Sequence, residues 1–212
     1  MILLGELAPG DPMPSERDLM VRFGVGRPAV REAMQSMHTL ELITISHGER
    51  AKVSELSVDI MFRQMDVVAR MLLSASPNNL EYLKEARRLF ELGMVKIAAL
   101  CARAADIKGL KASVAGQRSK LGDPPMFIRA DMAFHNKIAS LSGNPIFSAI
   151  SDAMLNWQFK YHTDLLHWSG QENVTLGEHE KVVECIASGD PERAAAVMRS
   201  HLDRSDDLYR YH

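Results

Sequence analysis

SERDLMVRFGVGRPAVREAMQSM, residues 15–37, carries the signals for two short helices joined by a tight turn. Ser15 and Asp18 fit the capping-box pattern S-x-x-[DE] at the start of the first helix, and Gly24 suits its C-terminal end. Gly26 is suited to cap a second helix, because a proline lies in the first turn and apolar residues then recur at helical spacing. One residue separates the two glycines, so the pattern predicts a helix, a tight turn and a second helix.

Two short β-rich runs follow this helix pair. LITIS, residues 42–46, and RAKVS, residues 50–54, flank three turn residues and predict a small hairpin. A helix-turn-helix followed by a hairpin is a winged helix-turn-helix. We expect this domain over residues 1–54.

The rest of the chain, residues 55–212, has few Gly or Pro interruptions and shows helical periodicity. Long apolar helices joined by short loops favour an antiparallel all-helical bundle. The whole chain is therefore predicted to be mainly α, with two domains. We expect the helices of the second domain at about 57–75, 79–105, 107–120, 125–142, 145–168, 175–188 and 191–210.

The composition limits the kind of protein. The 25 basic and 27 acidic residues give a net charge of −2, so any contact with nucleic acid must use a local basic patch. Cys101 and Cys185 lie far apart in apolar helical segments, which indicates buried free thiols in a reducing compartment. No apolar run approaches the roughly 18 residues of a membrane span. We expect a cytoplasmic protein that does not cross a membrane.

Arginines gather where the two predicted short helices meet. Arg27 and Arg31 share one face of the second helix, where guanidinium groups can read guanine or grip phosphate in the major groove of double-stranded DNA. Arg17, one turn into the first helix, can reach the DNA backbone. His47 and Gly48 at the hairpin tip suit a minor-groove contact. A single arginine of this kind is ordinarily solvated, and the DNA-binding hypothesis depends on the whole arrangement.

Four polar residues lie on apolar helix faces in the second half of the chain. Asp131 and His135 are one helical turn apart, and His179 and His201 each lie on the apolar side of a later helix. One carboxylate and three neutral imidazoles suit Zn²⁺ or Ni²⁺, and less specifically Mn²⁺, with room for water or an effector carboxylate. The alternative is a hydrogen-bonded cluster in the core.

Several phrases carry a resemblance to known proteins. PSERDLMVRFGVGRPAVREAMQSM and ITISHGERAKV resemble the DNA-binding domain of the GntR superfamily of bacterial regulators. The helical remainder resembles the FCD effector domain of its FadR subfamily. Within that subfamily VGRPAVREA, HGERAKV, FIRADMAFH and GNPIFSAI are most similar to the sialic-acid-responsive repressors.

The resemblance implies roles for individual residues. It assigns operator contacts to Arg17, Arg27 and Arg31, and a minor-groove wing tip to His47 and Gly48. The FCD metal pattern falls on Asp131, His135, His179 and His201. The remaining residues that we assign to the effector cavity are Arg87, as a clamp for a carboxylate, and Asn144, Asn156 and Lys160.

The sequence departs from the family in two places. Gly26 stands where relatives often have a hydroxyl-bearing residue, which argues against a side-chain contact with phosphate there. The family also usually has a further helix before the position of Ile2, so we expect the first helix of the DNA-binding domain to be missing.

The residue patterns predict a DNA-binding protein with a buried metal site, and the resemblance implies a repressor controlled by a small carboxylate or sugar acid, such as sialic acid. A homodimer is expected, because a winged helix-turn-helix reads a palindrome with two recognition helices. One alternative is a metal-dependent hydrolase-like enzyme, although no further acid or nucleophile is clearly phased beside the four ligands. Another is a dimeric metabolite sensor with an incomplete DNA-binding head.

Overall fold

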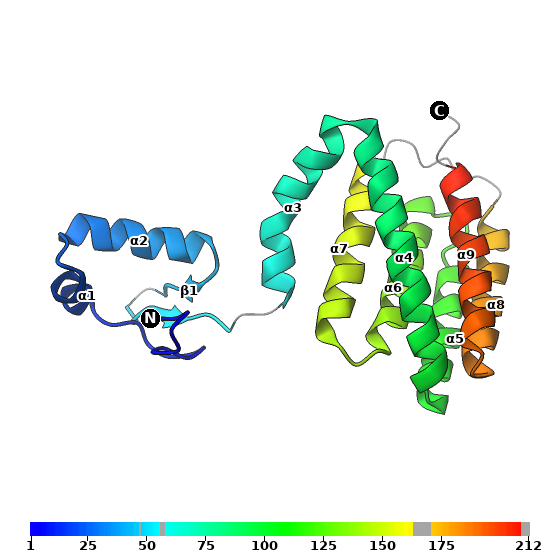
Figure 1. Cartoon of the computed structure of the whole chain (residues 1–212), viewed down its shortest axis with the longest axis horizontal. Coiled ribbons are helices and arrows are strands. Elements are labelled where there is room, and N and C mark those ends of the chain that lie inside the picture. The colour runs from blue at the N-terminus through cyan, green and yellow to red at the C-terminus, as the bar shows by residue number, and fades with distance from the viewer. Residues whose placement is uncertain (47, 56–57, 163–170, 209–212) are drawn as a thin grey trace. The chain divides into compact units, whose positions relative to one another are not determined.

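The computed structural model describes residues 1–46, 48–55, 58–162 and 171–208 (Figure 1). Helices dominate the described part of the chain, which confirms the prediction of a mainly α protein. The chain divides into two compact units, Met1–Gln64 and Met65–His212. The division lies inside helix α3 (Val58–Ala75), beyond the limit expected at residue 54.

The first unit contains the predicted helix pair, α1 (Glu16–Phe23) and α2 (Arg27–Thr39) (Figure 1). The capping box of Ser15 and Asp18 is present in full. Gly24 ends α1 in the left-handed backbone conformation, with φ of 65°. A residue with a side chain would be strained in this conformation. Gly26 is the N-cap of α2, as predicted.

The hairpin is shorter than the two predicted five-residue runs. It consists of β1 (Ile43–Thr44) and β2 (Lys52–Val53), paired antiparallel with Ile43 opposite Val53. The first strand begins at Ile43 and not at Leu42, because the Leu42 N–H donates to the Met37 carbonyl oxygen at the end of α2. Ile43 and Val53 are buried and form a small core with Met13.

The second unit is an all-helical bundle built from long helices. α4 packs against α6, α7, α8 and α9, and α5 packs against α6 and α8. Among the described residues no helix has both the length and the apolar character of a membrane span. The helices that follow α3 are α4 (Pro77–Cys101), α5 (Ala104–Arg118), α6 (Pro124–Ser140), α7 (Pro145–His162), α8 (Glu172–Ala187) and α9 (Pro191–Leu208).

Two details correct the sequence-based expectations. α4 ends at Cys101 and not near 105, because Ala102 and Arg103 are extended and the Asp106 carboxylate accepts the Arg103 N–H to start α5. As a result Cys101 is exposed at a helix end and its Sγ contacts the Leu141 carbonyl, whereas it was expected to be buried. Cys185 is buried, and both thiols are free as predicted.

The core of the second unit surrounds the polar residues that the sequence marks. Its two largest fully buried members, Phe127 and Phe134, come from α6, which also buries Ile138. Phe134 stacks on the ring of His179, with centroids 4.1 Å apart. This apolar packing surrounds the imidazole rings at the centre of the bundle.

Candidate functional site

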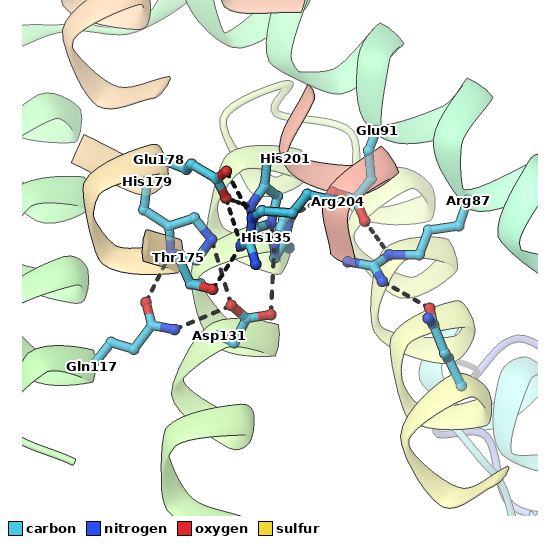
Figure 2. Close-up of polar contacts among 11 residues, drawn as sticks. Arg87, Glu91, Gln117, Asp131, His135, Thr175, Glu178, His179, His201 and Arg204 are labelled. Carbon is cyan, nitrogen blue, oxygen red and sulfur yellow. Dashed lines mark hydrogen bonds and ion pairs between the residues drawn. The ribbon is translucent and has the colours of Figure 1, made fainter. Parts of the chain in front are cut away.

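Helices α6, α8 and α9 bring together the four residues predicted as metal ligands. Asp131 and His135 lie one turn apart on α6, His179 lies on α8 and His201 on α9, and their side chains meet at one point (Figure 2). One ligand atom from each lies within 4.8 Å of the others, and all four residues are buried. This arrangement can hold a divalent cation.

Each imidazole has an oxygen acceptor on its outer nitrogen. The Nδ1 atoms of His135, His179 and His201 lie 2.5 Å, 2.8 Å and 2.8 Å from oxygens of their outer partners. An oxygen acceptor requires the hydrogen on Nδ1, which leaves the lone pair of each ring on Nε2. The partner of His135 is Glu91 on α4, that of His179 is Gln117 on α5, and that of His201 is Glu178 on α8.

The Nε2 atoms face one another and Asp131. The Nε2 atoms of His135 and His201 are 3.3 Å apart, and His179 Nε2 lies 3.4 Å from Asp131 Oδ1. Asp131 is fixed by a 3.1 Å hydrogen bond from the Gln117 amide, which also accepts from His179. Among the described residues His179 Nε2 has no hydrogen-bond donor, although it is buried. Acceptors thus face acceptors, and a shared cation would satisfy them together.

The titration behaviour fits neutral imidazoles flanked by ionised carboxylates. Burial lowers the pKa of His179 well below its usual value, and burial also lowers that of His201. Burial would raise the pKa of Glu91, but Arg87 and His135 outweigh it and hold that pKa far below its usual range. For Glu178 burial is likewise outweighed, and hydrogen bonds from His201 and Arg204 lower its pKa to about 2.

Arg87 is linked to this cluster through Glu91. Its Nε donates to Glu91, whose other oxygen accepts from His135, and its Nη1 donates to Gln158 Oε1 at 2.7 Å (Figure 2). A continuous polar chain therefore runs from Arg87 to an imidazole of the cluster. The Nε2 of the buried Gln158 has no hydrogen-bond partner in the described part of the chain, so it can donate to a bound oxygen.

The other residues assigned to the effector cavity bond locally. The Asn144 side chain accepts from the Ile146 N–H at the start of α7, and Asn156 donates to Asp152 one turn earlier. The side chain of Lys160 lies outside the described residues. The structure does not connect Asn144 or Asn156 to the four-residue cluster, and their role stays a prediction.

The residues that sequence reasoning missed form the outer ring of the cluster. A partial signal existed for Glu91, which is one helical turn from Arg87 and thus on its face of α4. Glu178 adjoins His179 and Arg204 lies one turn after His201, so they carried a similar partial signal, whereas Gln117 and Gln158 gave none. The missed residues are Glu91, Gln117, Gln158, Glu178 and Arg204.

In the first unit the predicted DNA-binding arginines are exposed. Arg17 lies on α1, and Arg27 and Arg31 lie on α2, where the Nε atoms of both pair with Glu16 of α1. The sequence from Arg22 to Arg31 contains no acid, yet the fold brings one beside it. Gly48 is exposed with φ of 79°, and His47 lies outside the described residues.

Comparison with known proteins identifies both units. The family described as "Bacterial regulatory proteins, gntR family" matches residues 1–53, and the FCD domain matches residues 82–204. The chain belongs to the GntR family, in the group with an FCD domain. This family consists of DNA-binding transcription regulators and not of enzymes, so the hydrolase alternative is not favoured.

Relatives of this GntR-family chain extend over nearly its whole length. It is 36% identical over 208 residues to the "HTH-type transcriptional repressor NanR" of Cronobacter sakazakii, covering 96% of this chain and 78% of that protein. It is 35% identical over 205 residues to the protein of the same name from an Enterobacter species, with the same coverage. Among solved structures, Streptococcus agalactiae GntR superposes with a TM-score of 0.62 at 21% identity, covering 97% of this chain and 94% of the other. Escherichia coli McbR/YncC gives 0.56 at 15% identity, with 97% and 90% covered.

Proposed function

We propose that this GntR-family protein is a cytoplasmic transcription repressor that binds operator DNA as a homodimer. A small carboxylate or sugar acid, such as sialic acid, would control its operator affinity by binding beside a divalent metal ion in the helical unit. The observation that carries the proposal is the convergence of three imidazole Nε2 atoms and the Asp131 carboxylate at one buried point. The relatives named as repressors support the direction of regulation.

The charges around the cluster favour an anionic effector. Arg87 compensates Glu91 and Arg204 compensates Glu178, which leaves the charge of Asp131 as the only unbalanced one in this set. A divalent cation would bring the buried site to one net positive charge, and a carboxylate would neutralise it. Three imidazoles and one carboxylate fit Zn²⁺ or Ni²⁺ best, with Mn²⁺ as a further candidate. Bound there, the metal would act as a Lewis acid that holds a carboxylate oxygen.

An apolar surface on the helical unit supports a homodimer. Tyr82 and Leu89 lie two turns apart on α4 and are 63% and 78% exposed, and α3 exposes Val68, Met71 and Leu72. Exposed apolar side chains typically mark an interaction surface where they lie together in one patch. A second copy of the chain is the partner we propose, because a palindromic operator requires two heads.

One experiment tests the proposed function directly. The protein is first used to select the duplexes that it binds from a random pool. Light scattering should then show that the protein bound to a selected duplex has the mass of a dimer. N-acetylneuraminate with Zn²⁺ or Ni²⁺ should weaken that complex in a gel-shift assay, whereas the chelated protein should respond less. A monomer would contradict the proposed homodimer, and the absence of any selected sequence would contradict the DNA-binding part and favour the dimeric metabolite sensor. An unchanged complex with every metal would exclude this sugar acid as the effector.

The two arginines of α2 are expected to read bases, and Arg17 to contact the backbone. Arg27→Ala and Arg31→Ala should each weaken binding to the selected duplex by about 1–3 kcal/mol and relax the preference at one position. Arg17→Ala should weaken binding to all duplexes alike. It should also reduce the salt dependence of the affinity by the equivalent of about one phosphate contact. Fluorescence anisotropy at several salt concentrations measures both effects. Wild-type affinity in all three variants would remove these arginines from the interface.

A further inference from the structure

An acidic side chain lies within the proposed DNA-reading surface. Glu16 occupies the first turn of α1, and its carboxylate bridges the two exposed arginines of α2. Glu16 Oε2 lies 2.6 Å from Arg27 Nε, and its Oε1 lies 3.3 Å from Arg31 Nε. DNA is a polyanion, so a carboxylate at this place repels the phosphates and weakens binding. A carboxylate here is therefore expected to have a role that offsets this cost.

Helix capping does not account for this role. The N-terminus of α1 is already capped by Ser15 and Asp18, which satisfy each other's backbone N–H groups. Glu16 instead reaches across to the next helix, and a hydrogen bond with Arg27 contributes most to lowering its pKa, so it stays ionised at neutral pH.

The atoms used in the ion pairs leave the arginines able to read bases. Glu16 takes the Nε edge of both side chains, and Arg27 and Arg31 have no other polar partner in the described part of the chain. The Nη edge of each guanidinium therefore remains available for O6 and N7 of guanine. Glu16 thus pairs with both guanidinium groups before DNA arrives and favours orientations that leave their Nη atoms free, which reduces the ordering cost of specific binding.

We propose that Glu16 is a specificity-determining residue that disfavours non-specific DNA binding. In the base-reading complex the arginines keep their bonds to Glu16 and use their Nη atoms on guanine. In a non-specific complex they must turn to phosphate groups, leave Glu16 unpaired and bring its charge close to the backbone. The ion pairs are compatible with the first complex and oppose the second. This inference rests on the proposed DNA-binding role of Arg27 and Arg31.

The test compares Glu16→Gln with a matched control. Glu6→Gln also removes one carboxylate of the same unit that pairs with an exposed arginine, since Glu6 Oε2 lies 2.6 Å from Arg22 Nη2. The probes are a duplex selected by the wild-type protein and a duplex of scrambled sequence. Anisotropy titrations at several salt concentrations give the affinity for each, and melting curves show that the variants are folded.

The scrambled duplex should gain most from Glu16→Gln. We expect the ratio of selected to scrambled affinity to fall at least about five-fold, and the salt slope on scrambled DNA to steepen by about one to two phosphate contacts. Glu6→Gln should change both affinities by similar factors and keep the ratio. An unchanged ratio in Glu16→Gln, with wild-type selectivity intact, would overturn the role of Glu16. A wild-type protein that selects no sequence would instead overturn the proposed function itself.

Discussion

His179→Ala is expected to remove most of the affinity of the helical unit for Zn²⁺ or Ni²⁺. Among the described residues His179 Nε2 is a buried acceptor without a donor, and its Nδ1 is held by Gln117, so the variant loses one ligand and the alignment of Asp131. Changes to outer partners alone typically cost about 10–100-fold in metal affinity, and loss of a ligand should cost at least that much. Calorimetry with the chelated and dialysed protein measures the affinity.

A matched histidine outside the cluster provides the control. His38 also uses Nδ1 in a hydrogen bond, at 3.0 Å from the Ile43 carbonyl oxygen, but it lies in the first unit. His38→Ala should therefore leave metal affinity unchanged. The chelated wild-type protein should melt at a lower temperature than the metal-loaded protein, since a metal that binds only the native state stabilises it. If His179→Ala binds metal as the wild type does, the four residues are a hydrogen-bonded core and not a metal site.

The same cluster gives the metal-free protein a defined dependence on pH. Burial depresses the pKa of His179 and His201 in the folded state, whereas the unfolded chain binds protons near 6.5. Below about pH 6.5 the unfolded state binds more protons than the native state, so stability falls as the pH falls. Metal affinity should fall in the same range, because protonated imidazole cannot ligate.

Glu91→Ala is expected to destabilise the protein by about 3–5 kcal/mol, since it removes one partner of a buried ion pair. Glu91 is 5% exposed and accepts from both Arg87 and His135, so its loss removes the acceptor of the Arg87 Nε–H and of the His135 Nδ1–H, both of them buried. Urea unfolding followed by circular dichroism measures the change. Glu85, an exposed residue on the same helix, is the control, and Glu85→Ala should stay within about 0.5 kcal/mol of the wild type.

A second pair of variants separates the charge of Glu91 from its shape. Glu91→Gln keeps an acceptor oxygen and should cost less stability than Glu91→Ala, yet it should still weaken metal binding about 10-fold or more by making His135 a poorer ligand. Replacing Arg87 and Glu91 together by Met should recover part of the stability, because no charge is then left unpaired. If Glu91→Ala lies within about 1 kcal/mol of the wild type, the buried pair does not have the importance that we assign to it.

The sequence predicted features that depend on neighbouring residues. The capping box at Ser15, the glycine that ends α1 and the apolar faces carrying His179 and His201 are all encoded within one or two helical turns. For this reason the helix-turn-helix and the inward direction of the four polar residues could be inferred before the fold was known.

Features that depend on distant segments could not be inferred in this way. Gln117 and His179 are 62 positions apart, and Glu91 and His135 are 44 apart, so each contact exists only once the helices have packed. The end of α4 was missed because neither Gly nor Pro marks it. There the chain is turned by the backbone of Arg103 bonding to Asp106, a signal too short to stand out in the sequence.

The outer partners of the cluster also determine how the helical unit can move. Glu91 links α4 to α6, Gln117 links α5 to α8, and Glu178 links α8 to α9, while Arg87 reaches Gln158 on α7. The central imidazoles and their partners are thus connected by hydrogen bonds to six helices. Local opening of a single helix would have to break this shared network, so we expect the bundle to open as one cooperative unit. When a metal ion binds the four residues, hydrogen exchange should slow together in all six helices.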